Sequence, residues 1–148
     1  MAISDDLLER AVEFHGHLGP FLILGLKAGL LANSLLGKDC FKTTAVVATD
    51  PNPPHSCLID GVQFVTGCTM GKGNLKFKRS KNIYVLFLKE DRELKLKLKR
   101  DILDFIRNAS SEKDSEKVAL ELLRKPASEL FIIERSVKKR VRAKTSVL

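Results

Sequence analysis

The sequence predicts a single α+β domain in which a mainly antiparallel sheet packs against helices, and three observations support this class. The chain has 148 residues, which is enough for one well-cored domain and short for two. A largely apolar helical segment precedes several short strand-like segments, the last of which alternates strictly between leucine and lysine. No internal repeat, low-complexity stretch or linker divides the chain, so we expect residues 1–148 to form one unit.

Two helices are expected first. Ser4, followed by two aspartates, predicts a capped helix that glycines interrupt at Gly16 and Gly19. A proline at a first helical position then opens a mostly apolar helix over Pro20–Leu36. Gly25 and Gly29 lie four residues apart on one face of this helix, where they allow another backbone to approach closely. A second copy of the chain would fit there, so we expect a homodimer.

The remaining elements follow from β-branched runs, alternation and capping residues. Ser56 is expected to cap a helix that Gly67 ends. Over residues 93–100 the leucines are expected to point inward and the lysines outward, which indicates a sheet with one solvent-exposed face. The expected strands are 43–49, 75–79, 83–88, 93–100 and 130–141, and the expected helices are 57–66, 101–108 and 112–125.

Composition limits the environment of the protein. Three cysteines, an odd number, do not make a disulfide framework, so a reducing cytoplasm is expected. The N-terminus is acidic and amphipathic, unlike a secretory signal, and no apolar run approaches the roughly 18 residues needed to span a bilayer.

The net charge of +8 is unevenly distributed. Residues 72–100 carry 11 basic and 3 acidic side chains, and the basic tail over residues 135–148 carries 6 and none. Such asymmetry can indicate anionic partners, or it can be a lysine-rich solvated face. We keep a nucleic-acid-binding module that uses Lys72–Arg100 and the tail as the alternative function.

The residues that can bind metal lie in two glycine-rich segments. His15 and His17 flank one glycine, and Cys57 is expected at the N-terminus of a helix, where the dipole and free amides favour the thiolate. If the fold brings them together, they would form a nitrogen and sulfur ligand set of the kind that Zn²⁺ or another divalent transition metal prefers. Asp60, one turn further on, is suited to orient a histidine, or only favours the helix N-terminus.

Cys68 raises a geometric question. It follows Cys57 by 11 residues, which is roughly 16 Å along an unbroken helix, too far for one metal ion. We place it with His15, His17 and Cys57 in the metal site, and with Cys57 as a catalytic thiol, on the condition that the loop folds back or that two subunits each donate one cysteine. The alternative is a small buried residue beside a turn.

The loop of Gly71, Lys72, Gly73 and Asn74 does not match a phosphate-binding loop, because its glycine spacing is wrong and it follows a helix. Its backbone amides are still suited to hold a carboxylate or another anion of a cofactor. A tight turn that leads into a strand is the alternative.

The two segments together resemble the E subunit of formylmethanofuran dehydrogenase (FmdE) and its stand-alone relatives in archaea and anaerobic bacteria. The resemblance covers about residues 10–90. It is carried by His15-Gly16-His17-Leu18, by Cys57 with Asp60-Gly61-Val62-Gln63, and by Thr66 through Leu75. Gly19 stands where the family usually has a cysteine, and Phe21 where it usually has a glycine.

The resemblance implies a metal-binding core domain of C1 metabolism and methanogenesis, often within a dimer. Its role would be enzymatic, or accessory to the subunits of a molybdenum or tungsten dehydrogenase, with a small-molecule substrate that the motifs do not specify. The missing cysteine at Gly19 is expected to leave an open coordination position, which suits a catalytic site.

Overall fold

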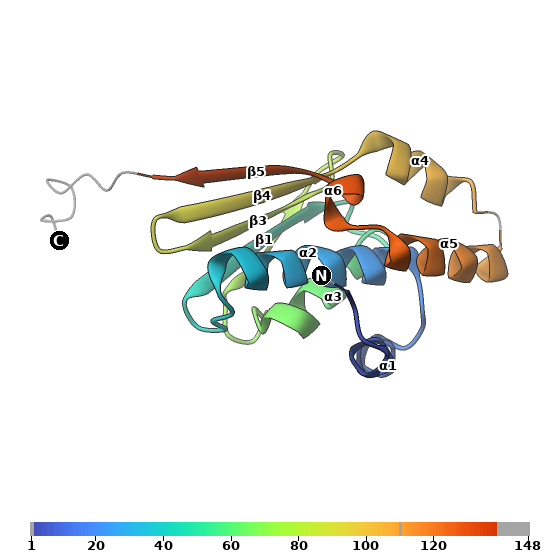
Figure 1. Ribbon diagram of the computed structural model, residues 1–148, viewed down its shortest axis with the longest axis horizontal. Helices are drawn as coiled ribbons and strands as arrows, with labels where there is room; N and C mark the ends of the chain where they lie inside the picture. The colour runs from blue at the N-terminus through green and yellow to red at the C-terminus, as the bar shows by residue number, and fades with distance from the viewer. Residues whose placement is uncertain (1, 110, 139–148) are drawn as a thin grey trace, which may run out of the picture.

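The computed structural model describes residues 2–109 and 111–138, which form one sheet and the helices around it (Figure 1). The expected α+β class is confirmed. In chain order the elements are α1 (Asp5–His15), α2 (Pro20–Leu36), β1 (Thr43–Thr49), α3 (Cys57–Thr66), β2 (Leu75–Arg79), β3 (Tyr84–Lys89), β4 (Arg92–Leu98), α4 (Arg100–Arg107), α5 (Glu112–Arg124), α6 (Ala127–Leu130) and β5 (Phe131–Val137).

The five strands form one sheet in the order β2-β1-β3-β4-β5. The pairs β1–β3, β3–β4 and β4–β5 are antiparallel, so the sheet is mainly antiparallel as expected. The pair β1–β2 is parallel, which corrects the expectation of antiparallel pairing between these two strands. The reason is the connection: the chain leaves β1, runs through α3 and enters β2 from the same end, as a parallel pair requires.

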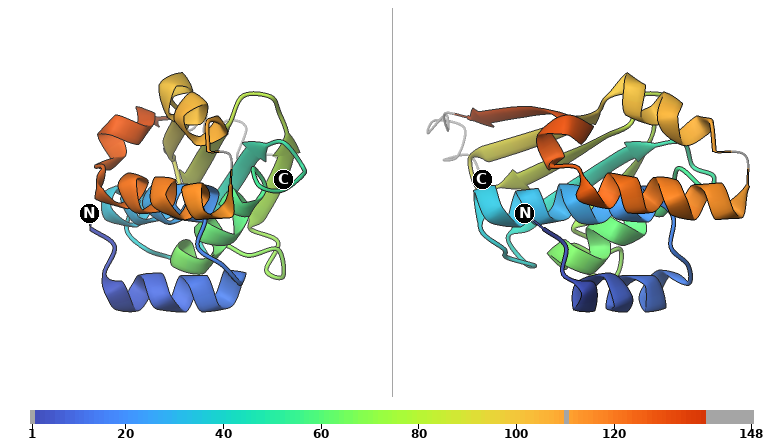
Figure 2. Two further views of the ribbon diagram at one scale, coloured as in Figure 1. Left: turned by 90° about the vertical axis from the view of Figure 1, so that its right-hand side faces the viewer. Right: turned by 45° about the vertical axis from the view of Figure 1, so that its right-hand side comes forward.

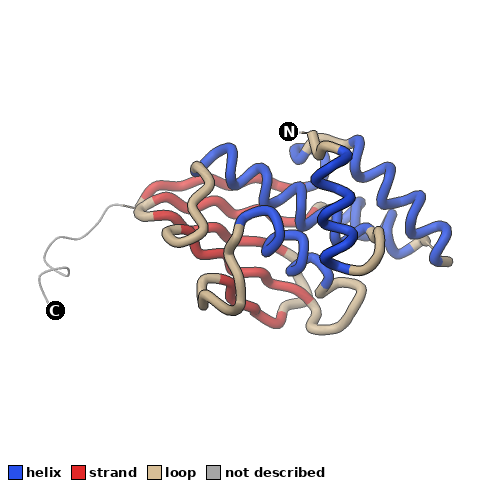
Figure 3. Tube along the Cα trace, turned by 90° about the horizontal axis from the view of Figure 1, so that it is seen from below, coloured by secondary structure: helices blue, strands red, loops and turns tan. Residues whose placement is uncertain are grey.

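The helix α2 lies across one face of the sheet, and Figure 3 shows the helices overlying that face. The leucines of α2 at positions 22, 24 and 26 are fully buried. From the sheet, Leu94 and Leu96 of β4 are fully buried beneath it, which confirms the inward leucines of the alternating strand. Lys89 and Arg92 donate to the carbonyl oxygen of Leu36, at 2.9 Å and 2.8 Å, and so satisfy the last turn of α2.

Glycines allow α3 to lie directly against α2. A Cβ added to Gly61 would lie 2.5 Å from the carbonyl oxygen of Leu22 and 2.8 Å from the Cα of Gly25. A Cβ on Gly29 would collide with Val65. The backbone that Gly25 and Gly29 admit therefore belongs to α3 of the same chain, so these glycines no longer give a reason for a dimer. On the side of α3 away from the sheet, α1 forms a further layer (Figure 2).

Most ends of elements lie within two residues of their expected positions. Ser4 caps α1 by accepting a hydrogen bond from the amide of Leu7, and Gly67 ends α3 in the left-handed conformation. Ser56 does not cap α3, because its backbone is already helical and its side chain makes no capping hydrogen bond. The expected last strand reaches Val137. Its continuation to residue 141 and most of the basic tail lie outside the described residues.

Across residues 2–109 and 111–138, none of the helices combines the length and the apolar character needed to cross a bilayer.

Candidate metal centre

The two histidines are positioned by the break between α1 and α2. His15 is the last residue of α1, and Gly16 ends the helix at a φ of 110°, a backbone conformation that favours glycine. His17 lies in the short link that leads to Pro20, the first residue of α2. The centroids of the His15 and His17 rings lie 4.7 Å apart, so the two side chains lie close together, as expected.

Cys57 is the first residue of α3, and α3 packs on α2 through the glycine contact. Partial burial of the thiol, and then the nearby charge of Asp60, raise the pKa of Cys57 above its ordinary value. Both effects disfavour the thiolate, in the opposite direction to the effect expected of the helix N-terminus.

The structure brings His15, His17 and Cys57 together. One ligand atom from each residue lies within 4.8 Å of the others, and within the described ranges this is the group of histidine, cysteine and acidic side chains that is close enough to hold one ion. His17 is exposed, while His15 and Cys57 are half-buried. An imidazole pair with one thiolate is a donor set that selects zinc or a neighbouring transition metal over magnesium or calcium.

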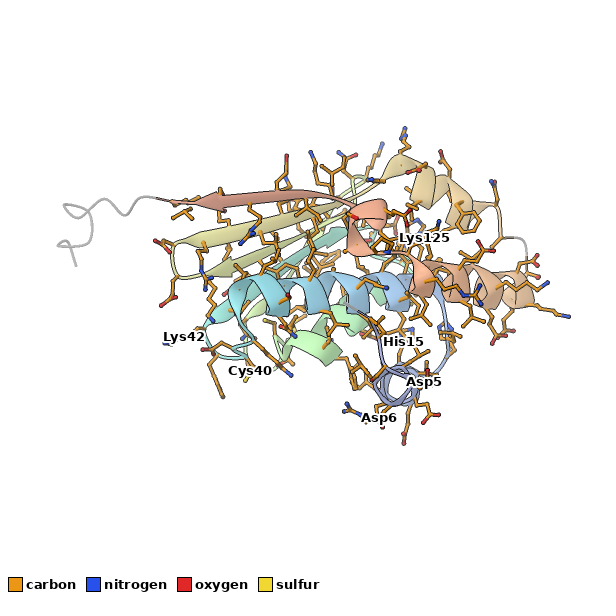
Figure 4. All side chains as sticks on the ribbon, viewed as in Figure 1. Asp5, Asp6, His15, Cys40, Lys42 and Lys125 are labelled. Carbon is orange, nitrogen blue, oxygen red and sulfur yellow. The ribbon has the colours of Figure 1, made fainter. Side chains whose placement is uncertain are left out.

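His15 is held by a carboxylate. Its Nδ1 lies 2.6 Å from Oδ2 of Asp60, and the side chain of His15 is only 7% exposed. Because an ionised carboxylate can only accept, Nδ1 donates this hydrogen bond, and in the neutral ring the lone pair is then on Nε2. Figure 4 shows His15 where α1 meets the other helices. Asp60 therefore makes the contact expected of a carboxylate that orients a histidine.

The other nitrogen of His15 has no partner. Over residues 2–109 and 111–138, Nε2 of His15 and Oγ1 of Thr49 are the buried side-chain nitrogen or oxygen atoms without a hydrogen bond. A buried polar atom without a partner costs free energy, about 1–3 kcal/mol, unless a ligand satisfies it. The observed donor set and this unsatisfied nitrogen fit a metal ion.

A cavity of about 280 Å³ lies beside the group, and His15, His17 and Cys57 are among the residues that line it. Two further polar side chains, Glu112 and Ser115 from the first turn of α5, also line this cavity. Sequence reasoning missed both, because they lie far along the chain in a helix without a motif. Their spacing of three residues, which places them on one helical face, is the one signal available.

Gly19 lies in the wall of the same cavity. A Cβ added to Gly19 would lie 3.1 Å from Cε1 and 3.5 Å from Nδ1 of His17. A side chain at position 19 would therefore point toward the histidine group, and glycine there leaves that space open.

Cys68 is not part of this group. It lies beyond the C-terminal end of α3, fully buried, and its thiol donates to the carbonyl oxygen of Thr43 at 3.4 Å. Burial raises the pKa of Cys68. Cys40 lies near this end of α3, beside Gly67, and Figure 4 shows it well apart from His15. The described chain does not fold back to bring Cys68 to Cys57.

The glycine loop lies at the same far end. The side chain of Asn74 donates to the carbonyl oxygens of Cys40 and Thr43 and accepts from the amide of Thr69. The amides of Lys72 and Gly73 also donate within the loop. These bonds give Asn74 a structural role and leave fewer amides for an anion. The cofactor role of Gly71, Lys72, Gly73 and Asn74 stays a prediction.

The fold and this cluster define a small α+β protein with a histidine and cysteine group of metal-ligand type at the N-terminal end of α3. The family described as "FmdE, Molybdenum formylmethanofuran dehydrogenase operon" matches residues 14–139, and the chain belongs to this family. The family resemblance stated from the motifs is thereby confirmed.

Two similar proteins show how far this likeness extends. A tungsten formylmethanofuran dehydrogenase FmdE-like protein from Syntrophus aciditrophicus has the same fold, with a TM-score of 0.65 and 21% identity over 91% of this chain and 72% of that one. A probable S-adenosyl-L-methionine-binding protein of Archaeoglobus fulgidus is 41% identical over 71 residues. That match covers 47% of this chain and only 19% of the relative's length.

Proposed function

We propose that this protein binds one divalent transition metal, Zn²⁺ first, through His15, His17 and Cys57, and that it presents the metal to a small molecule in the adjoining cavity. The observation that carries the proposal is the buried Nε2 of His15, which has no hydrogen-bond partner while Asp60 holds the opposite nitrogen. Metal-binding histidines are commonly oriented by a carboxylate in this way.

Of the other two ligands, only His17 differs from His15 in exposure. His17 is on the solvent side of the group, and Cys57 is half-buried. The raised pKa of Cys57 means that the thiol holds its proton until a cation is near, so metal binding releases a proton. Cys68 is left out of the proposed ligand set, because its thiol already donates a hydrogen bond to the carbonyl oxygen of Thr43.

The cavity wall indicates what such a metal could do. A bound transition metal polarises a carbonyl group or lowers the pKa of a bound water molecule. Glu112 carries a carboxylate on the α5 side of the cavity, and Gly19 leaves room beside His17. This arrangement supports an open site rather than a closed structural one, with Glu112 placed to hold or accept a proton from a bound small molecule.

Membership of the FmdE family supports a role in C1 metabolism beside a molybdenum or tungsten formylmethanofuran dehydrogenase. We propose the other subunits of such an enzyme as partners, and the cytoplasm as the location, in keeping with the three unpaired cysteines. Co-purification with the dehydrogenase subunits from cells that express them tests the partnership.

Elemental analysis and isothermal titration with Zn²⁺ on the full chain without a histidine tag test the site itself. The wild type should carry or take up close to one metal per chain. The variants His15→Ala and Cys57→Ser should each lose most of that binding while their circular dichroism stays that of the wild type. Loss of a ligand leaves too few donors for tight binding.

Matched controls use the same residue types outside the group. His55→Ala removes the remaining histidine, which packs against Phe21, and Cys40→Ser removes a half-buried cysteine at the other end of α3. Both controls should keep the metal. If His15→Ala and Cys57→Ser bind as the wild type does, the proposed site is wrong.

A further inference from the structure

The sheet has a second face on which α2 and α3 do not pack, and α4 borders one end of it through Arg100 and Leu103. The helices α2 and α3 pack on the face that carries Val85 and Leu94, as Figure 1 shows with the sheet seen nearly edge-on. We call the opposite side the outer sheet face. Its side chains come from alternate positions of the five strands, and many of them are lysines.

Strand register arranges these lysines in two rows. In the first row Lys76 of β2 and Lys95 of β4 flank Val46 and Leu86. In the second row Lys78 and Lys97 flank Ala48 and Tyr84. Three strand spacings separate the lysines of each row, which is roughly 14 Å. Four cations therefore surround a narrow apolar and aromatic floor.

A groove of about 520 Å³ extends the second row toward the end of the sheet. Lys95 and Lys97 line it together with Lys81 and Arg100, and no carboxylate is among its lining residues. Tyr84 lies in its wall, with Nζ of Lys95 4.4 Å from the ring centroid. Cations beside an aromatic ring, without an acidic neighbour in the groove, match the chemistry of phosphates linked to planar bases.

The acidic residues of the outer sheet face are confined to its β4–β5 edge. Glu134 lies 3.7 Å from Lys97, and Glu93 lies 3.3 Å from Lys138. Lys76, Lys78, Lys81 and Arg100 make no ion pair within the described chain. The basic surface without paired acidic residues therefore extends from β2 to the start of α4. This surface is longer than a single phosphate group would need.

We propose that the outer sheet face and its groove bind single-stranded nucleic acid. Lys76, Lys78, Lys81 and Arg100 contact the phosphates, and a base packs at Tyr84. The metal group lies among the helices on the other side of the sheet, so this site is independent of the proposed metal function. Sheets that bind single strands combine a basic surface with aromatic rings, and here the aromatic ring is the half-buried Tyr84.

Fluorescence anisotropy with labelled oligothymidylate and oligouridylate on the full chain tests the proposal. Affinity should fall steeply with salt, and the double variant Lys78→Ala/Lys81→Ala should lower the salt slope by about 1.4, since each phosphate contact on a single strand contributes about 0.7. The control double variant Lys113→Ala/Lys117→Ala, on exposed positions of α5, should leave the affinity and the slope unchanged.

Tyr84 separates base stacking from general charge attraction. Tyr84→Ala should weaken binding by about tenfold, whereas Tyr84→Phe, which keeps the ring, should bind as the wild type does. Metal content should be the same in all of these variants. Equal losses in both lysine double variants, preference for duplex DNA, or equal competition by oligoglutamate would each overturn the proposal.

Discussion

Each end of α3 carries a motif cysteine, Cys57 at the N-terminal end and Cys68 just beyond the C-terminal end, and the two cysteines lie in opposite surroundings. At the C-terminal end, the thiol of Cys68, the hydroxyl of Thr66 and the amide of Asn74 all have partners within the protein. At the N-terminal end, Nε2 of His15 is buried without a partner, and Cys57 borders a cavity. A motif residue whose hydrogen bonds are satisfied within the protein therefore holds the fold, while an unsatisfied one beside a cavity is available for a ligand.

The contact between α2 and α3 holds both ends of α3 in place. A substitution that breaks this contact should therefore lower the free energy of unfolding the most. Gly61→Ala puts a methyl group against the backbone of Leu22 and Gly25. The free energy of unfolding should fall by about 3 kcal/mol, because the obstacle is backbone that cannot rotate away. Urea denaturation measures this loss. Gly71→Ala, at a position with open space, should change stability by less than about 0.5 kcal/mol.

Asn74→Ala tests the C-terminal end of α3, where the polar groups have hydrogen-bond partners within the protein. The change leaves the carbonyl oxygens of Cys40 and Thr43 and the amide of Thr69 without this partner. We expect a loss of about 2 kcal/mol in stability, with zinc uptake unchanged. Asn33→Ala, which removes one hydrogen bond to Val65, should cost about half as much in the same denaturation experiment. A loss of metal in Asn74→Ala would show that the two ends are not separate.

Asp60→Asn tests the N-terminal end of α3, where Nε2 of His15 has no hydrogen-bond partner. The variant loses the carboxylate that orients His15, and zinc affinity should fall by about 10- to 100-fold with little change in stability. Asp60 also raises the pKa of Cys57, so its removal makes the thiolate easier to form and acts in the opposite direction. Titration with Zn²⁺ decides between the two effects. A rise in affinity would mean that orientation of His15 matters less than the charge near the thiol.

Lys27 offers a smaller comparison, since most of its side chain is buried while its ammonium nitrogen is not among the buried atoms that lack a hydrogen bond. It is 5% exposed in the middle of α2, it makes no hydrogen bond or ion pair in the described chain, and burial lowers its pKa. Lys27→Met should raise the free energy of unfolding at neutral pH by about 1 kcal/mol. Lys38→Met, at an exposed position, is the control.

The pH dependence of this gain has a definite sign. The folded-state pKa of Lys27 lies below 10.5, so the charged lysine destabilises the fold fully at lower pH. The penalty is relieved as pH rises through the folded-state pKa toward 10.5. The stability difference between Lys27→Met and the wild type should therefore shrink in this range, and urea denaturation at neutral and at alkaline pH measures it. A difference that grows with pH would contradict this assignment.

Local patterns in the sequence predicted most of the fold. Apolar periodicity and capping residues placed α2 and α3, and the alternation of leucine and lysine placed β4, because these signals act over a few neighbouring residues. Long-range geometry was less accessible. The glycines of α2 indicated a close backbone contact, but the sequence did not show that the partner was α3 rather than a second chain.

The residues of the candidate site likewise fall into two groups, those that local motifs predicted and those that only tertiary packing brings to the site. Motifs indicated His15, His17, Cys57 and Asp60, which the structure brings together. They did not indicate Glu112 or Ser115, because α5 reaches the cavity only through tertiary packing. The sequence also did not show the effect of burial on the pKa of Cys57, since this effect depends on atoms that tertiary packing brings around the thiol.

The packing of α2 on α3 also bears on how the protein would acquire its metal. The fully buried side chains that join the helices to the sheet, such as Leu22, Leu24 and Leu96, include none of the proposed ligands, and Cys57 packs only at the edge of this core, partly buried. The chain can therefore complete its core before any ion arrives, unlike a zinc finger, which folds only with its metal. Loading then becomes a step after synthesis that depends on the supply of the ion, and a chelator would empty the site and leave a folded protein ready to be filled again.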